Sequence, residues 1–265
     1  MKKLFIFGDV HSFYEDWIEA LDKAGFDKDN KDHILVSLGD ICDRGFGSVE
    51  CLKLINSIDS DRKICIIGNH ELMMEEMINR GSATTSDYHN GAVKTIEQLT
   101  GITKQTQTAL IEMKDNELWN NYKKEWCFYS EVGNHIFVHG WIPCEVDNIY
   151  RPEKYKYIED WRNASVEKFK EATWLNGMEA WHKGVKEEGK TIYMGHWHTS
   201  FGHCHYHEYG VEFVRSKIVS ELFAEYGPFI DEGIVALDAC TVISRFVNVY
   251  VIEVEDKEWE ERKSN

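Results

Sequence analysis

The chain has 265 residues, of which 43% are hydrophobic and 29% are charged. This composition is typical of a globular protein and excludes disordered, collagen-like and low-complexity classes. Its 46 acidic and 30 basic residues give a formal net charge of −16. Nucleic acids and anionic membranes would repel such a chain at long range. We therefore expect neither as a partner, and the oligomeric state stays open.

The cysteines and the apolar runs indicate where the protein works. The seven cysteines are odd in number and scattered, and no two have C-x-x-C spacing, which favours a reducing compartment. The apolar run at residues 4–7 ends at Gly8, which is too short for a signal peptide. No stretch approaches 18 apolar residues. We expect a cytoplasmic protein.

Short apolar runs bounded by Gly, Asp or His predict buried strands. In chain order they are residues 4–7, 34–38, 64–67, 136–138, 192–194 and 234–237. Helical spacing of apolar residues predicts helices over 14–24 and 49–58. This alternation of strand and helix is typical of parallel βαβ units.

The remaining segments complete one predicted domain over residues 1–265. Residues 72–125 are polar and helix-favouring, and we interpret them as a helical insertion beside the site. Residues 153–190 form a second polar helical region with several tryptophans, which at such spacings are more often core than a ligand platform. The pattern predicts a strand within 246–254 and a frayed end over 255–265.

Five of the predicted strands end in Asp, Asn or His. The segments that carry these residues are GDVH at 8–11, GDICDRG at 39–45, GNHE at 68–71, HG at 139–140 and GHWH at 195–198. In open α/β sheets, ligands bind beyond the carboxyl ends of the strands, so these residues should converge. Each alone could be a helix cap, a turn or a core histidine. The joint pattern favours one shared site.

The chemistry of these residues predicts a metal site. Carboxylate, amide and imidazole donors together suit divalent Mn, Fe or Zn. There are enough donors for two ions with one bridging carboxylate. Two ions about 3.5–4 Å apart form the usual clamp for phosphoryl displacement.

These motifs resemble the signature of the calcineurin-like metallophosphoesterase superfamily. The pair GDICDRG and GNHE is similar to the phosphoprotein phosphatase branch, and within it to the compact bacterial and phage lambda-phosphatase-like serine/threonine phosphatases. Residues 90–95 and the segment Leu-Asp-Ala-Cys at 237–240 also resemble that subgroup. The likeness covers nearly the whole chain. It implies a four-layer α/β/β/α sandwich of two mixed sheets.

The resemblance also implies two divalent ions, with Mn²⁺ expected and Fe or Zn as alternatives. The implied metal ligands are Asp9 and His11 for the first ion, Asp40 as the bridge, and Asn69, His139 and His196 for the second. A hydroxide bridging the two ions would attack phosphorus directly. His70, oriented by Asp43, would then protonate the leaving oxygen. Arg44 would grip the phosphate with a bidentate fork, beside Asn69.

Several residues depart from the family pattern. Ser12 replaces a usual glycine, and Trp141 replaces the second glycine of the HGG motif. His198 is an extra histidine, and it either ligates the first ion or has a supporting or surface role. A second phosphate-binding arginine is missing, and Arg162 and Asn176 are the candidates to replace it.

Three further histidines, His203, His205 and His207, alternate along a predicted strand. This spacing would place them on one face, but surface or supporting roles are favoured over extra metal binding.

The predicted function is that of a metal-dependent phosphomonoesterase, and specifically of a serine/threonine protein phosphatase. Its substrate would be a phosphorylated protein or a small phosphate ester. One alternative is a bis(5′-nucleosyl)-tetraphosphatase or another nucleotide phosphohydrolase, because the fold does not decide the substrate. Another is a non-catalytic module that binds phosphorylated partners, although such a module would not need the pair His70 and Asp43.

Overall fold

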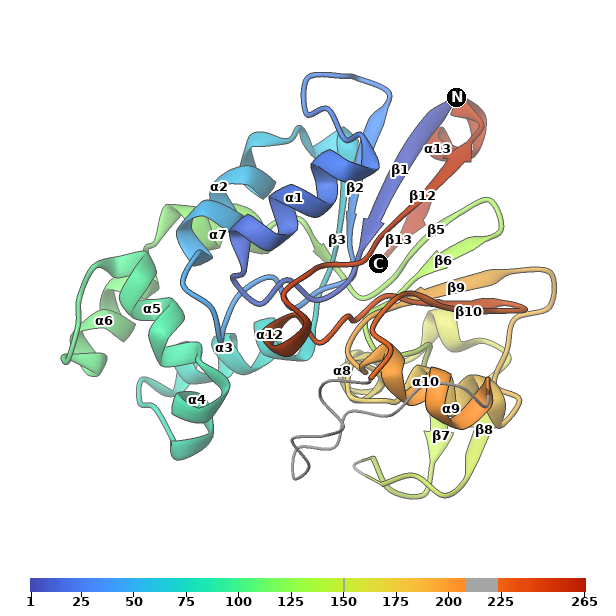
Figure 1. The fold of residues 1–265 in the computed structure, drawn as a ribbon. Helices are drawn as coiled ribbons and strands as arrows, with labels where there is room; N and C mark the ends of the chain where they lie inside the picture. Colours follow the sequence, from blue (N-terminus) through green and yellow to red (C-terminus); the bar gives the residue numbers. More distant parts are fainter. Residues whose placement is uncertain (150, 208–223) are drawn as a thin grey trace.

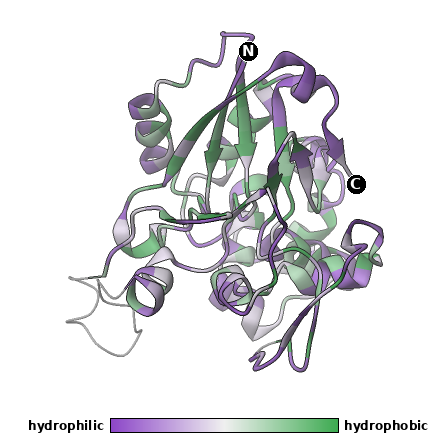
Figure 2. Cartoon of the chain, turned by 90° about the vertical axis from the view of Figure 1, so that its right-hand side faces the viewer, coloured by the Kyte–Doolittle hydropathy of each residue, from purple (hydrophilic) through white to green (hydrophobic). Residues whose placement is uncertain are grey.

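The computed structural model describes residues 1–149, 151–207 and 224–265. Two mixed β-sheets lie at its centre, with helices on the outer side of each (Figure 1). The calcineurin-like sandwich expected from the resemblance is therefore confirmed. The central strands are largely hydrophobic, whereas the helices around them also carry hydrophilic residues (Figure 2).

The first sheet contains most of the N-terminal strands. Its order is β12 (Val249–Val254), β1 (Lys2–Phe7), β2 (His33–Ser37), β3 (Lys63–Ile66) and β4 (Trp126–Cys127). Strands β1 to β4 pair in parallel, and β12 pairs antiparallel with β1. Since β1, β2 and β3 are parallel, their carboxyl ends lie at the same edge of the sheet.

The second sheet is built from the C-terminal half. Its order is β10 (Phe229–Asp231), β11 (Ile234–Ala236), β9 (Thr191–Met194), β6 (His135–Phe137), β5 (Ser130–Val132) and β13 (Lys263–Ser264). Strands β11, β9 and β6 are parallel, and the others are antiparallel to their neighbours. A small antiparallel pair, β7 (Cys144–Val146) and β8 (Tyr155–Tyr157), lies apart from both sheets.

The helices cover the two outer faces. The N-terminal helices are α1 (Tyr14–Ala24), α2 (Ser48–Ser57), α3 (Asn69–Arg80), α4 (Thr85–Asn90), α5 (Ala92–Thr100), α6 (Thr106–Met113) and α7 (Glu117–Lys123). The C-terminal helices are α8 (Val166–Ala172), α9 (Gly177–His182), α10 (Thr199–Tyr206), α12 (Thr241–Ser244) and α13 (Asp256–Glu260). Residues 69–123 are thus helical with short connections. Short 3₁₀ turns occupy Ser60–Arg62 and Trp161–Asn163.

Alternating side chains along the strands build the layers. In β1, Leu4 and Ile6 point into the core between the sheets, whereas Phe7 packs with the N-terminal helices. In β9, Tyr193 points into the core between the sheets and Ile192 packs with the C-terminal helices. Because side chains alternate with a period of two, each strand contributes to two cores. This explains why the strands are apolar on both faces.

Two expectations from the sequence are wrong. The C-terminal segment does not fray, because Trp259 of α13 is buried and β13 pairs with β5. The segment with His203, His205 and His207 runs through helix α10 and its end, not a strand. Their rings therefore do not share one face: His205 packs on Phe201, while His203 packs on Phe229.

None of the helices in the described ranges combines the length and the apolar character needed to cross a membrane. All seven cysteines lie in these ranges, and none forms a disulfide.

Candidate metal centre

The predicted metal ligands meet where the carboxyl ends of β1, β2, β3, β6 and β9 approach one another. The residues that follow these five strands, and that the structure brings together there, are Asp9, His11, Asp40, Asn69, His70, His139 and His196. They come from both sheets, so the centre lies where the two sheets meet.

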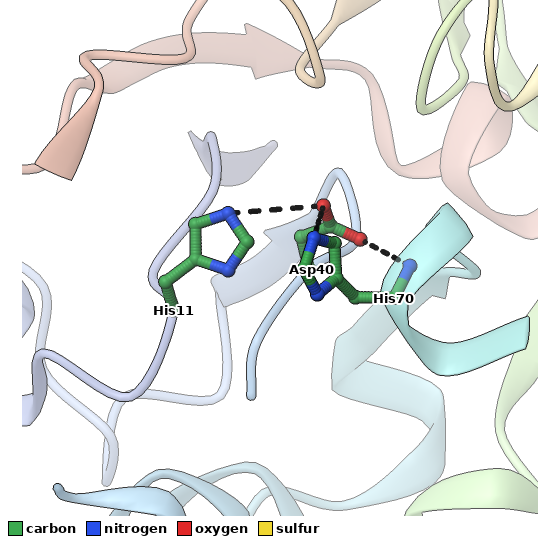
Figure 3. A group of neighbouring side chains, drawn as sticks. All are labelled: His11, Asp40 and His70. Atoms are coloured by element: carbon green, nitrogen blue, oxygen red, sulfur yellow. Dashed lines mark hydrogen bonds and ion pairs between the residues drawn. The ribbon is translucent and has the colours of Figure 1, made fainter. Parts of the chain in front are cut away.

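Asp40 is the common member of two ligand groups. Its Oδ2 atom lies 3.8 Å from His11 Nε2 and 3.9 Å from His70 Nε2 (Figure 3). Its Oδ1 atom lies 3.5 Å from His139 Nε2. One group contains His11, Asp40 and His70, and the other contains Asp40, His139 and His196, with ligand atoms within 4.8 Å of one another in each. A carboxylate shared in this way has the geometry of a bridging ligand.

Hydrogen bonds to backbone carbonyls orient the histidines. His11 Nδ1 donates to the carbonyl of Cys42 over 3.1 Å, and His139 Nδ1 donates to the carbonyl of Leu38 over 2.7 Å. These bonds leave each Nε2 atom directed at Asp40. Metal-binding histidines usually use one ring nitrogen in this way and bind through the other.

The contact between Asn69 and His139 tests whether a cation fits. Asn69 Oδ1 lies 2.9 Å from His139 Nε2, whose ring already donates through Nδ1. In the neutral imidazole both facing atoms carry lone pairs, which repel each other unless a cation accepts them. Two ligands about 2.1 Å from one ion at right angles would lie about 3 Å apart. The pair therefore fits a divalent ion.

Buried charge gives a second test. Burial alone would raise the pKa of Asp40, but His139, His70, His11 and His196 outweigh it and lower that pKa. The pKa of Asp9 is raised well above its usual value by burial and then by the nearby carboxylates of Asp238 and Asp40. Carboxylates buried side by side are costly unless a cation compensates them. The donor set therefore suits metal binding.

The surroundings of two predicted metal ligands, His11 and His196, favour the neutral form of the imidazole. Burial lowers the pKa of His11, and the Arg44 charge lowers it further. The pKa of His196 is lowered to about 3 by burial and by His139. Neutral imidazole is the form that binds metal.

The predicted acid pair is also assembled. His70 Nδ1 lies 2.7 Å from Asp43 Oδ2, and Thr95 donates to the other oxygen of Asp43 over 2.8 Å. Burial would lower the pKa of His70, but the charges of Asp40 and Asp43 outweigh it and raise that pKa. The guanidinium of Arg44 donates to His70 Nε2 over 3.1 Å. The predicted phosphate-binding and proton-donating groups thus lie side by side.

Strained loops hold these residues. Among the described residues, nine other than glycine have a positive φ, and six of them are at this site: His11, Ser12, Asp40, Asp43, Arg44 and His196. Such backbone costs about 1–3 kcal/mol per residue and clusters at functional sites.

Glu71 supports the loops, although the sequence analysis assigned it no role. Its carboxylate accepts hydrogen bonds from the backbone of Asp40, Ile41 and Gly68 at 2.9–3.0 Å. Burial and then the Asp40 charge raise its pKa to about 7. Its place in the GNHE motif was the available signal. Gly68 must be glycine, because a Cβ there would lie 2.1 Å from Asp40 Oδ1.

Asp238 is a second residue that the sequence analysis did not assign to the site. It follows β11, is buried, and lies 3.8 Å from His198 Nε2 through its Oδ2 atom. The signal was a sixth strand ending in Asp. The side chain of His198 is 30% exposed and belongs to neither tight ligand group. Its role as a ligand stays a prediction.

Of the two candidates for the second phosphate-binding arginine, Arg162 has structural partners, whereas the Nδ2 donor of Asn176 is buried without a hydrogen-bond partner among the described residues, so the role of Asn176 stays a prediction. Arg162 pairs with Glu131 at 2.8 Å and Glu187 at 3.2 Å and stacks on Trp161, which argues against a phosphate contact. Asn176 caps α9 by accepting a hydrogen bond from the backbone of Glu179. These contacts use the guanidinium of Arg162 and the amide oxygen of Asn176.

The model of the calcineurin-like phosphoesterase family matches residues 2–228. The chain belongs to this family. It is therefore a phosphoesterase, a hydrolase of a family that uses divalent metal ions, and its own His/Asp groups suit such ions.

Solved structures with a similar fold include three differently named enzymes. A candidate diadenosine tetraphosphatase is 15% identical with a TM-score of 0.46, covering 95% of this chain and 89% of that chain. A serine/threonine phosphatase from Saccharomyces cerevisiae is 17% identical with a TM-score of 0.46, covering 74% and 61%. A cold-active protein-tyrosine phosphatase from Shewanella sp. is 14% identical with a TM-score of 0.48, covering 100% and 80%. No curated protein matches the chain. At these sequence identities and TM-scores, the similar structures do not indicate the substrate of this chain.

Proposed function

We propose that the chain is a metal-dependent phosphomonoesterase that acts on phosphoserine and phosphothreonine in proteins. The observation that carries this proposal is that Asp40 is shared by two groups of donor atoms, one of which includes His70, the histidine that also pairs with Asp43. The first feature suits two cations, and the second suits protonation of an alkoxide leaving group. A module that only bound phosphorylated partners would not need the second.

The residues that would hold the ions are divided between the two sheets. Asp9, His11 and Asp40 would hold the first ion, with His198 as a further candidate, and the second would be held by Asp40, Asn69, His139 and His196. When bound, two divalent ions would polarise the phosphate and activate water as the nucleophile. We expect Mn²⁺, with Fe or Zn as alternatives, because the donors mix oxygen and imidazole nitrogen.

The chain's own residues would do the rest. Arg44 would bind two phosphate oxygens through its planar fork and so orient the ester. His70 would give the proton at Nε2 to the leaving oxygen, since Nδ1 is held by Asp43. Thr95 fixes Asp43 and thereby the ring. In the structure Arg44 contacts that same Nε2 atom, so substrate would have to move the guanidinium from the ring to the phosphate.

The charge and the cysteines support the proposed substrate class and compartment. A net charge of −16 repels polyanions such as dinucleoside polyphosphates more than a single phosphate on a protein. Seven cysteines without a disulfide support the expected cytoplasmic location.

The test combines metal analysis with a substrate panel of phosphopeptides, mononucleotides, dinucleoside polyphosphates and p-nitrophenyl phosphate. We expect two ions per chain and the highest kcat/KM on phosphopeptides. A higher kcat/KM on dinucleoside polyphosphates would identify a nucleotide hydrolase instead. Tight binding of p-nitrophenyl phosphate by the metal-loaded protein without hydrolysis would identify a binding module.

A further inference from the structure

A groove opens beside the proposed phosphate-binding residue. It has a volume of about 490 Å³ and is lined by the loops after β1 and β2, including Ser12, Arg44 and Phe46, and by Arg245 near the C-terminus. Ser12 follows the ligand His11, and Arg44 contacts His70. The groove therefore begins where the phosphate would be held. A substrate larger than the phosphate itself could extend into it.

An exposed aromatic ring marks this groove. The side chain of Phe46 lies two residues after Arg44, and the residue is 79% exposed. Lys94 holds the ring in place, because its Nζ atom lies 3.7 Å from the ring centroid and donates to the carbonyl of Arg44 over 2.8 Å. Lys94 therefore links the ring to Arg44, while most of the ring surface remains open to solvent. Such a surface suits the apolar part of a bound side chain.

Apart from Arg44, which would hold the phosphate, the free charges in the groove are negative. Arg245 is paired with Asp16 at 2.9 Å and packs on Phe13, so its charge is largely compensated. Glu15 and Glu50 also line the groove, both are exposed, and neither has an ion-pair partner in the described part of the chain. A ligand with positive charge would therefore complement the groove, whereas further phosphates would be repelled.

We propose that this groove binds the peptide segment next to the phosphorylated residue and selects segments that carry arginine or lysine. The aliphatic stem of the basic side chain lies on Phe46, and its charged end reaches Glu15 or Glu50. This inference rests on the proposed protein phosphatase function and names its substrate class. A nucleobase stacked on Phe46 is the competing occupant, but the two carboxylates and the net charge of the chain disfavour the phosphates that would accompany it.

The experiment compares two phosphopeptides that differ only in arginine or glutamate beside the phosphoserine. We expect the wild-type protein to hydrolyse the arginine peptide with about tenfold higher kcat/KM, since an exposed ion pair with the arginine contributes about threefold and repulsion of the glutamate contributes a similar factor. The double variant Glu15→Gln/Glu50→Gln should bring the ratio close to one. Raising the ionic strength should also lower the ratio, because salt screens exposed charges.

The variant Phe46→Ala should lower kcat/KM about threefold to tenfold on the arginine peptide through lost side-chain packing, and less on the glutamate peptide, whose side chain has a shorter stem. Its kcat/KM on p-nitrophenyl phosphate should fall less than that on the arginine peptide, because that ester does not extend along a peptide groove. Matched controls lie on α6, outside the groove: Ile111→Ala removes an exposed apolar side chain, and Glu112→Gln removes an exposed carboxylate. Both should behave as wild type.

Four results would overturn the inference. Equal kcat/KM on the two peptides, or a preference unchanged in the double variant, would remove the groove's role but leave the phosphatase function standing. If Phe46→Ala impaired nucleotide hydrolysis alone, the ring would serve a nucleobase. If the protein hydrolysed p-nitrophenyl phosphate but no phosphopeptide, both the proposed role of the groove and the protein phosphatase function would be refuted.

Discussion

The candidate metal centre has two halves: the first consists of the loops that follow strands of the first sheet, and the second consists of the loops that follow strands of the second sheet. These two halves are held in different ways. The loops after β1 and β2 bond to each other directly: the backbone of His11 donates to Asp40 over 2.9 Å, and that of Ser12 donates to Ile41 over 2.7 Å. Five of the six strained site residues lie in these two loops. Among the site residues named above that follow strands of the second sheet, His196 alone has such a backbone, and His198 is partly exposed.

A few hydrogen bonds join the second half to the first. The backbone of His196 donates to Asp9 Oδ1 over 3.0 Å, and Thr241 Oγ1 donates to the carbonyl of Asp9 over 2.7 Å. His139 reaches across to the carbonyl of Leu38. The comparison teaches that the first half is organised by its own loops, whereas the second contributes its ligands through the docking of one sheet on the other.

The substitution with the largest expected effect is Asp40→Asn, because Asp40 is the carboxylate shared by both ligand groups. Loss of the shared charge should lower the affinity for both ions by more than about 100-fold and reduce hydrolysis to background, beyond the 10–100-fold typical of residues that only support a ligand. His139→Ala should weaken only the second ion, while also abolishing activity. Elemental analysis and calorimetric metal titration measure both. Two tightly bound ions in Asp40→Asn would contradict the bridging assignment.

A change within the first half should separate catalysis from metal binding. We expect His70→Asn to reduce kcat by about 10²–10⁴, the usual contribution of acid–base catalysis, with two ions still bound. The measurement is steady-state kinetics on p-nitrophenyl phosphate and a phosphopeptide, with metal content as the control. Turnover at the wild-type rate would remove the general-acid assignment.

The second half can be tested through Asp238 and His198. If Asp238 positions His198 toward the first ion, His198→Ala and Asp238→Asn should each weaken that ion about 10–100-fold and leave the second ion in place. Metal titration monitored by calorimetry resolves the two ions. Unchanged binding of both ions in His198→Ala would show that this histidine is not a ligand.

The contact between the halves can be tested without touching a ligand. A Cβ at Gly8, after β1, would lie 2.4 Å from the carbonyl oxygen of Leu237, after β11. We expect Gly8→Ala to lower the free energy of unfolding by about 1–3 kcal/mol, the usual cost of overpacking. Chemical denaturation of the metal-free protein gives this value. Ala substituted at Gly25, where a Cβ meets nothing within 4 Å, separates this clash from general backbone strain.

The smallest expected change is in the titration of His70. Its folded-state pKa is raised above 6.5, so the imidazolium contributes stability that is fully present below pH 6.5 and is lost as pH rises through the raised value. Asp43→Asn removes one of the charges that raise this pKa, so the pKa should fall. Histidine ring NMR on the metal-free protein measures it. An unchanged titration would show that Asp43 has no electrostatic effect on the ring.

Local patterns in the sequence predicted most of the first half. Gly-Asp, Gly-Asn and the residues beside them directly follow apolar strands, and parallel pairing necessarily brings such ends to one edge. The strand prediction for the segment with His203, His205 and His207 was wrong because a short alternation of histidines is compatible with either period, and the packing of Phe201 and His203 favours the helix. The prediction that residues 255–265 fray was wrong because most residues of this segment are charged, whereas the single aromatic residue among them, Trp259, is buried and holds the segment in place.

The sequence by itself determined the strands, the donors at their ends and the family, since each depends on residues that are neighbours in the chain. Only the tertiary structure decided that Asp238 lies beside His198, that Arg162 is occupied by carboxylates, and that Phe46 stands exposed next to Arg44. These facts depend on which side chains from distant segments meet. That is determined by the packing of the two sheets and their helices, which no local pattern encodes.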